Sequence, residues 1–266
     1  MSGIEASFFD VTSLDRMAAG DTALHRLDPR AKVIVTVAFL LAVVSVGKYE
    51  VLRLLPFFIF PVAMAVAGNL PLRDLCGKVC LVIPFAAAVG GFNPLLDRQV
   101  LFEFGSFGVA GGWVSLASIV VRAVLTAAAA LLLVALTGFP ALCAALERLG
   151  VPQPFTVQLL FLYRYLFVLG GEGARAVRAR ELRSCGRRGR GFRGWGSLLG
   201  HLLLRSSLRA ERVHSAMLAR GFTGGFPARR TPGFGRGEWI FVLGCSAGFL
   251  LFRLYDVTGL LRGVAG

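Results

Sequence analysis

Two stretches of the sequence place an arginine at a predicted helix end, followed by a small residue and then by glycine. They are Arg183-Ser184-Cys185-Gly186 and Ala219-Arg220-Gly221. A cation in the last turn of a helix interacts favourably with the helix dipole, and a glycine after it permits a left-handed cap. Ordinary helix termination accounts for one such end, but it does not explain why two successive helices share the pattern.

The guanidinium group indicates a binding role for both ends. Its planar fork can form two parallel hydrogen bonds with one carboxylate, whereas an ammonium group acts as a point charge. The small residues beside each arginine let a helix tip enter a groove without steric conflict. We therefore expect Arg183 and Arg220 to act as two plugs for a partner protein, with Arg180 competing with Arg183 for the first position.

No residue constellation for catalysis or metal binding accompanies these arginines. The phosphate-binding pattern G-x-x-x-x-G-K-[ST] is missing, and the G-x-G-x-x-G row at 189–194 follows no predicted strand. The three histidines, His25, His201 and His214, lie far apart in the sequence. No nucleophile and base are evident either. We expect a non-catalytic chain that binds no metal and no cofactor of its own.

The composition places these arginines in a membrane protein. Of 266 residues, 56% are hydrophobic, and the mean hydropathy of +0.70 exceeds what a soluble domain can bury in one core. The formal net charge is +14, and residues 173–236 hold +13 of it, from fifteen arginines and two acids. Because Lys and Arg are retained on the cytoplasmic side of membranes, we expect this segment in the cytosol.

Long apolar runs rich in Ala and Leu, with no alternating segment, predict an all-α fold with about five to six transmembrane helices. The candidate spans are residues 31–47, 52–68, 77–92, 113–138, 154–171 and 238–253. Pro56, Pro61 and Pro84 interrupt the second and third, which are expected to be kinked or incomplete. Asp28 is expected to cap the first helix, and Gly138 to end the fourth run. Basic residues before the first span favour five crossings, with the N-terminus inside.

Two arginines lie inside the apolar runs. A charge in lipid is costly, so each guanidinium should face protein, water or a carboxylate. Arg122 suits a position near the end of its run, from which it reaches the interface. Arg164 lies mid-span between Tyr163 and Tyr165. For these residues a subunit contact or an intramembrane ion pair is the alternative to snorkelling.

The cationic segment resolves into two predicted helices. The first continues out of the fifth span and ends near Arg183, and the second runs from about Gly196 to Arg220. A mostly apolar face of the second consists of Leu199, Leu203, Ser206, Ala210, Val213 and Met217. The opposite side holds Arg205, Arg209 and Arg212. We expect the helix to pack through the apolar face and to expose the guanidinium groups.

A second hypothesis assigns the arginines to an anionic surface. The segment RRGRGFRGWG at 187–196 interleaves Phe192 and Trp195 with cations and glycines. Such a loop could bind anionic lipid or nucleic acid. This hypothesis predicts salt-dependent binding spread over many arginines, whereas docking predicts dependence on two. We favour docking, with proteins and the bilayer as partners and no nucleic acid.

The same residues resemble the transmembrane T component of energy-coupling factor (ECF) transporters, the EcfT/CbiQ family. Residues 183–184 and 219–222 are similar to its paired X-Arg-X signatures, often Ala-Arg-Gly. The stretches HRLDPRAKV (25–33) and FLYRYLFVLGGEGARAVRAREL (161–182) are similar too. The acidic leader and ARGFTG (219–224) look most like the cobalt or nickel branch, CbiQ. The likeness covers nearly the whole chain.

The resemblance implies a non-enzymatic scaffold subunit of a cobalt (or nickel) importer in the cytoplasmic (inner) membrane of a bacterium. Arg183 and Arg220 would each dock in a groove of one ATP-binding cassette (ABC) ATPase, CbiO-like, and these two ATPases would hydrolyse the ATP. Their closure would move a CbiM-like substrate-binding membrane subunit, which holds the metal. A small CbiN-like membrane subunit is a possible further partner.

This organisation divides the chain into four parts. They are a leader (1–27), the transmembrane helices (28–171), a cytosolic coupling region (172–236) and a final transmembrane helix with a tail (237–266).

Overall fold

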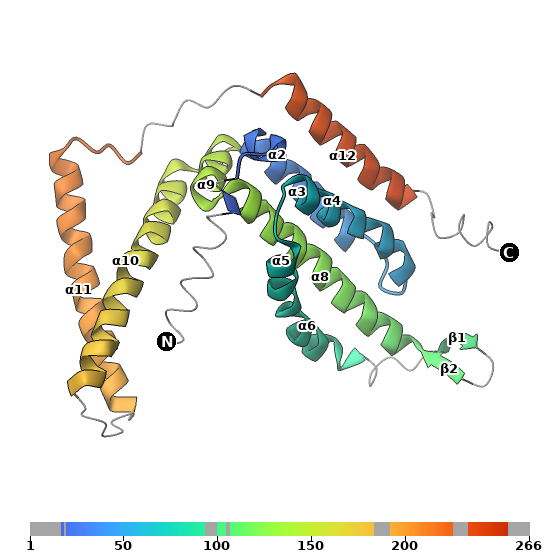
Figure 1. The fold of residues 1–266 in the computed structure, drawn as a ribbon, viewed down its shortest axis with the longest axis horizontal. Coiled ribbons are helices and arrows are strands. Elements are labelled where there is room, and N and C mark those ends of the chain that lie inside the picture. The colour runs from blue at the N-terminus through green and yellow to red at the C-terminus, as the bar shows by residue number, and fades with distance from the viewer. Residues whose placement is uncertain are drawn as a thin grey trace. The chain divides into compact units, whose positions relative to one another are not determined.

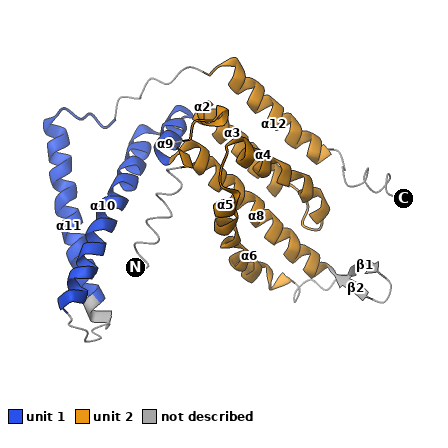
Figure 2. Ribbon diagram, viewed as in Figure 1, with its two compact units in different colours: residues 1–15, 139–231 blue, residues 16–138, 232–266 orange. Residues whose placement is uncertain are grey.

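The computed structural model describes residues 17–18, 20–93, 100–104, 107–183, 192–225 and 234–254. Helices dominate these residues, which confirms the all-α prediction (Figure 1). The chain forms two compact units (Figure 2). Unit 1 contains residues 1–15 and Phe139–Thr231, and unit 2 contains Arg16–Gly138 and Pro232–Gly266. The four-part division made from the sequence concerns placement relative to the bilayer, and it stays a prediction.

Unit 2 packs around an aromatic core. The helices that the structure describes in it are α2 (Ala23–Arg26), α3 (Pro29–Val44), the 3-10 helix η1 (Val51–Phe58), α4 (Ile59–Ala67), α5 (Leu72–Cys80), α6 (Val82–Gly90), α8 (Gly111–Thr137) and α12 (Arg236–Leu254). Phe39 of α3 is fully buried, and its ring centroid lies 4.7 Å from that of Phe60 and 5.3 Å from that of Phe249. Leu125 of α8 is buried against the same cluster. These contacts hold α4, α8 and α12 around α3.

The ends of α3 and α8 are formed as the sequence predicts. Pro29 occupies the first turn of α3, and the Asp28 side chain accepts a hydrogen bond of 2.9 Å from the backbone N–H of Arg30. Gly138 follows α8 with φ at +75°, and its N–H donates to the carbonyl of Val134 over 2.8 Å. Both termini are therefore set by local capping chemistry.

The described part of unit 1 consists of three helices: α9 (Phe139–Arg148), α10 (Gln153–Arg183) and α11 (Phe192–Ala219). Phe139 of α9 stacks on Tyr163 of α10 with 4.6 Å between ring centroids. Helices α10 and α11 lie side by side and run antiparallel (Figure 1), because Glu172 pairs with Arg209 while Arg180 lies over Trp195, near the start of α11.

Three helices among the described residues are long and apolar enough to cross a membrane: α8 with 27 residues, α10 with 31 and α12 with 19. Helix α3 has 16 residues, about 24 Å, which is shorter than the hydrocarbon core of a bilayer. The segment Val51–Ala67 is a shorter apolar helix as well. The number of full crossings stays a prediction.

The proline-containing runs are interrupted, as expected. Pro56 lies within a 3-10 helix, and regular α-helix begins only at Ile59. The third run divides at Leu81 into α5 and α6. A proline ring clashes with the carbonyl four residues earlier, and for Pro84 that residue is Cys80, the last of α5. The break therefore lies one turn before the proline.

Two features differ from the sequence analysis. The first is a hairpin of β1 (Val100–Phe104) and β2 (Phe107–Ala110), paired antiparallel, where no strand was expected. The second is the packing face of α11. Leu199 and Leu203 were expected to pack, but they are 60% and 67% exposed.

The half-buried face of α11 consists of Leu198, Leu202, Ser206, Arg209, Val213 and Met217. The expected face was therefore wrong in the first half of the helix, where the packed positions are shifted by one residue, and Ala210 is exposed as well. Arg209, placed on the outer side from the sequence, turns toward α10 because Glu172 offers it a carboxylate. Arg205 and Arg212 are exposed as expected.

Candidate functional site

The end of α11 is a hydrogen-bonded stop with Arg220 at its tip. The N–H of Phe222 donates to the carbonyl of Met217 over 3.0 Å, and the N–H of Gly221 donates to that of Leu218 over 2.9 Å. Gly221 has φ at +77°, in the left-handed region. This pair of hydrogen bonds is a Schellman motif, and it confirms the glycine cap predicted after Arg220.

The cap alone does not mark a functional site, since the same motif recurs in the chain. The N–H of Val151 donates to the carbonyl of Leu146 over 3.1 Å at the end of α9, around Gly150 with φ at +105°. Asn69 with φ at 51° takes the glycine's place after α4. What distinguishes the α11 end is the residue it presents rather than the way it terminates.

Arg220 is presented openly. Ala219, Arg220 and Gly221 are all exposed, and a Cβ added at Gly221 would meet no atom within 4 Å. The Arg220 guanidinium forms no hydrogen bond or ion pair with any other residue in the described part of the chain. Its donors are therefore available to a carboxylate from outside the chain.

The segment after the tip returns to the start of α10. The backbone at Gly225 lies close to the side-chain amide of Gln153, the first residue of α10. Residues 221–222 are held by the cap, and residue 225 comes back beside the start of α10. The tip is a short projection of unit 1.

The end of α10 offers the second arginine. Arg183 is the last residue of α10 and is exposed. Arg180 is half-buried, with its guanidinium carbon 5.6 Å from the centre of the Trp195 ring. Because Arg180 already has this partner, Arg183 is the more accessible of the two. The predicted cap at Ser184-Cys185-Gly186 lies outside the described residues, as do residues 187–191 of the Arg/Gly segment.

Helices α10 and α11 are joined by a polar contact as well as by apolar packing. The Arg209 guanidinium donates to the Glu172 carboxylate, whose side chain is only 13% exposed. Leu202 of α11 lies against Gly173. Since the helices are antiparallel and α11 is 28 residues long, about 42 Å, the two arginine tips lie at opposite ends of this pair.

Comparison with known proteins assigns a family to this arrangement. Residues 20–232 match CbiQ, described as cobalt transport protein. The chain belongs to the CbiQ family. An uncharacterized protein of Methanocaldococcus jannaschii is 25% identical over 211 residues, which cover 76% of this chain and 72% of the relative. Membership in this family, together with the long apolar helices, makes the chain a multi-pass membrane component of a cobalt transport system.

Of the two arginines within the apolar runs, Arg122 of this CbiQ-family chain has partners within unit 2 for one of its Nη atoms, whereas its buried Nε has none among the described residues. Its guanidinium donates to the carbonyls of Val46, over 2.7 Å, and Gly47, over 3.1 Å, just past the end of α3. It also lies 3.4 Å from the Ser118 hydroxyl. These contacts favour an intrachain structural role for Arg122 over a subunit contact. Arg164, by contrast, is exposed on α10.

The sequence analysis missed a buried lysine in the stretch HRLDPRAKV. Lys32 is 2% exposed, and its ammonium group donates to the carbonyl of Leu136, in the last turn of α8, over 2.9 Å. It also donates to the carbonyl of His25 over 3.3 Å. A cation at a helix C-terminus satisfies carbonyls that lack partners. Lys32 therefore fastens the start of α3 to the end of α8.

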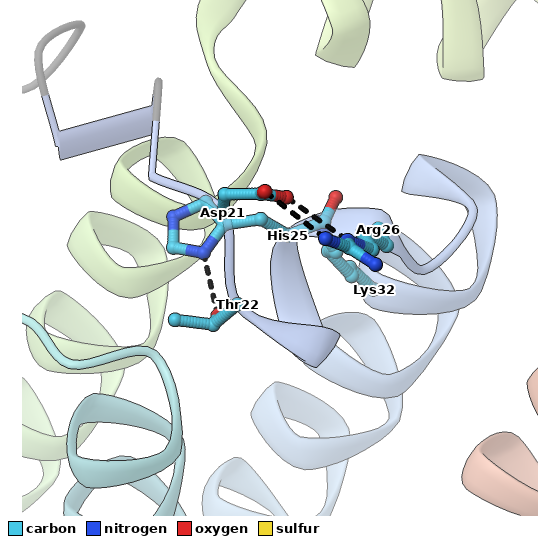
Figure 3. A network of polar contacts seen from close by, with 5 residues as sticks. All are labelled: Asp21, Thr22, His25, Arg26 and Lys32. Carbon is cyan, nitrogen blue, oxygen red and sulfur yellow. Dashed lines mark hydrogen bonds and ion pairs between the residues drawn. The ribbon is translucent and has the colours of Figure 1, made fainter.

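The residues before Lys32 form a small polar network (Figure 3). Arg26 makes a two-point contact with Asp21, with N to O distances of 2.9 and 3.0 Å, and holds the pKa of that carboxyl below its usual value. The Thr22 hydroxyl lies 2.7 Å from Nδ1 of His25, whose Nε2 lies 3.0 Å from the Met17 carbonyl. These contacts link Met17 and residues 21–26 to one another, and Lys32 joins the His25 carbonyl to α8. Within the described residues, no three His, Cys, Asp or Glu side chains are grouped so as to hold a metal.

Proposed function

We propose that this chain is the transmembrane coupling subunit, or T component, of an ECF-type importer for cobalt or nickel ions in the cytoplasmic (inner) membrane of a bacterium. In this role it carries out no chemistry itself. It transmits motion from two cytosolic ABC ATPases to a membrane subunit that binds the ion. The metal specificity resides in that subunit.

The observation that carries the proposal is the presentation of Arg220. It is an exposed arginine without a partner among the described residues, at a fixed helix tip between two small residues. A bidentate hydrogen bond to a carboxylate in a groove of an ATPase would use all of these properties. The backbone stop keeps the tip from fraying, so that little conformational freedom is lost on docking.

The spacing of the two tips supports two docking events rather than one. Arg183 and Arg220 lie at opposite ends of an antiparallel pair whose second helix is about 42 Å long. That separation is too large for both to enter one groove, and it suits one groove in each of two ATPase subunits.

The continuity of α10 supplies a route for the motion. One unbroken helix of 31 residues contains both the apolar run 154–171 and the exposed Arg183. A helix is stiff along its axis because each turn is hydrogen-bonded to the next. Displacement of its tip by a closing ATPase pair would therefore move the membrane segment.

A reconstituted system tests the proposal. The chain is assembled in liposomes with the ATPases and the ion-binding membrane subunit, and ATP hydrolysis and cobalt uptake are measured together. We expect Arg220→Ala to abolish uptake while ATP hydrolysis continues without coupling. Arg212→Ala, an exposed arginine two turns earlier on α11, serves as the control and should leave uptake unchanged. Unchanged uptake with Arg220→Ala would remove this residue from the mechanism.

A further inference from the structure

Arg164 is an exposed cation in the middle of an apolar helix. It forms no hydrogen bond or ion pair with any other residue in the described ranges, although it lies on α10. Around it on the helix are the half-buried apolar residues Leu160, Phe161, Phe167 and Val168. The guanidinium therefore stands within an apolar surface, and none of the described residues of unit 1 neutralises it.

Arg164 lies deep within the apolar run of α10. Gln153 at the start of the helix is eleven residues away, about 16 Å along the axis, and Glu172, the first charged residue after the run, is eight residues away, about 12 Å. Half of the hydrocarbon core is about 15 Å. This depth exceeds the reach of an arginine side chain, so snorkelling alone leaves the charge in hydrocarbon or forces the bilayer to thin.

Arg164 differs from Arg122 in its hydrogen-bond partners. Both arginines interrupt apolar runs, but Arg122 donates to the carbonyls of Val46 and Gly47, which lie beyond the end of α3. The carbonyls on either side of Arg164 are used by the hydrogen bonds of α10 itself. A hydrogen-bond acceptor for the Arg164 guanidinium must therefore come from outside α10.

The apolar runs of this sequence do not supply the required carboxylate. Of its fifteen acids, none lies within the apolar runs between residues 31 and 171, and in the last run only Glu238 occurs, at its first position. Neither another apolar run of this chain nor one of a second copy therefore offers an acid inside a span.

We propose that Arg164 is a contact site for a different membrane subunit, one whose transmembrane helix carries an Asp or Glu at mid-depth. The occupant is defined by charge complementarity within an apolar surface. An ion pair excluded from water would fix both the depth and the rotation of the partner helix. This inference rests on the proposed function only in taking the chain to be one subunit of a larger transporter.

Zero-length crosslinking tests the contact in intact membranes of cells that produce the whole transporter. Arg164→Lys introduces an amine at the same depth, and dicyclohexylcarbodiimide, which enters lipid, joins amines to adjacent carboxylates without a spacer. We expect one amide-linked product, mapped by mass spectrometry to an acid inside an apolar stretch of another membrane chain. Arg164→Leu should give none, and Arg175→Lys, eleven residues further along α10, should not capture that acid.

Charge exchange then tests the mapped pair. Arg164→Asp should lower recovery of the crosslinked subunit with the purified complex by at least about tenfold, and replacement of the mapped acid by Arg should restore it. No product from Arg164→Lys, a product with an acid of this chain, or unchanged recovery with Arg164→Asp would overturn the proposal. The ATPases are quantified in the same samples. Their absence from the wild-type complex would contradict the proposed function without affecting the crosslink.

Discussion

At the scale of single residues, the left-handed conformation of Gly221 closes the cap that holds Arg220 in place. Its φ of +77° costs a residue with a Cβ about 1–2 kcal/mol, although the space around it is open. Gly221→Ala should therefore loosen the last turn of α11 and weaken docking of an ATPase. Gly150→Ala carries a comparable strain at the end of α9, at φ +105°, and is the matched control.

We expect the two glycine variants to be similar in thermal stability but different in ATPase binding, measured by titration of the detergent-solubilised chain. Equal loss of binding in both would show that general destabilisation is responsible. Full binding by Gly221→Ala would show that the geometry of the tip is unimportant.

The identity of the cation at position 220 is a separate question. Arg220→Ala should weaken ATPase binding by about 10- to 100-fold, which corresponds to the loss of a charge-assisted hydrogen bond of about 1.5–3 kcal/mol. Arg220→Lys should fall between this variant and the wild type, because an ammonium group cannot make the bidentate contact. Wild-type affinity with lysine would mean that charge alone is sufficient.

At the scale of elements, the contact between Glu172 and Arg209 should stabilise the pairing of α10 and α11. Arg209 is 39% exposed, so solvent screening reduces the expected coupling to about 1 kcal/mol. A double-mutant cycle with Glu172→Ala and Arg209→Ala, followed by thermal unfolding, measures it directly. Additive losses would show that the apolar packing alone holds the two helices together.

The two intramembrane arginines should behave oppositely in the isolated chain. Arg122→Leu leaves the carbonyls of Val46 and Gly47 without their donor, and should lower the free energy of unfolding by about 1–3 kcal/mol. Arg164→Leu removes a charge that has no partner among the described residues, and should leave stability unchanged or raised. Comparable losses in both variants would contradict the distinction drawn between them.

Local chemistry explains which elements could be predicted from the sequence. Asp28 and Gly221 were predicted as caps because each acts on its own neighbours in the chain. The packing face of α11 was not predicted correctly, because leucines at 198, 199, 202 and 203 provide two adjacent apolar stripes, about 100° apart around the helix, that are equally apolar. Only the partner helix, through Glu172, selects between them.

Long-range contacts explain what was missed in the sites. Lys32 binds a carbonyl 104 positions away and Arg122 one 76 positions away. The spacing of apolar residues along the sequence does not indicate which distant carbonyl a buried cation will contact. The arginine tips were predictable as candidates because their small neighbours are adjacent in sequence, and their role as docking plugs stays a prediction.

At the scale of the whole molecule, charge and apolar surface are separated along the chain. Nearly all of the net charge of +14 lies in residues 173–236, which continue from a long apolar helix of a CbiQ-family membrane protein. A polybasic lipid-binding segment would share its affinity among many arginines and weaken steadily with salt. A coupling scaffold depends on two arginines in particular.

Affinity purification of the tagged chain from detergent-solubilised membranes tests most directly whether binding depends on two arginines or on many. The wild type is compared with the Arg183→Ala/Arg220→Ala double variant. An Arg205→Ala/Arg212→Ala double variant of the same net charge is the control. Co-purifying chains are identified by mass spectrometry, and ATPase activity is assayed in each preparation. We predict that an ABC ATPase accompanies the wild type and the control but is lost from the variant at the two tips. Recovery of an ATPase that is indifferent to both arginines, or of none at all, would contradict the account and leave the two ends as ordinary helix caps.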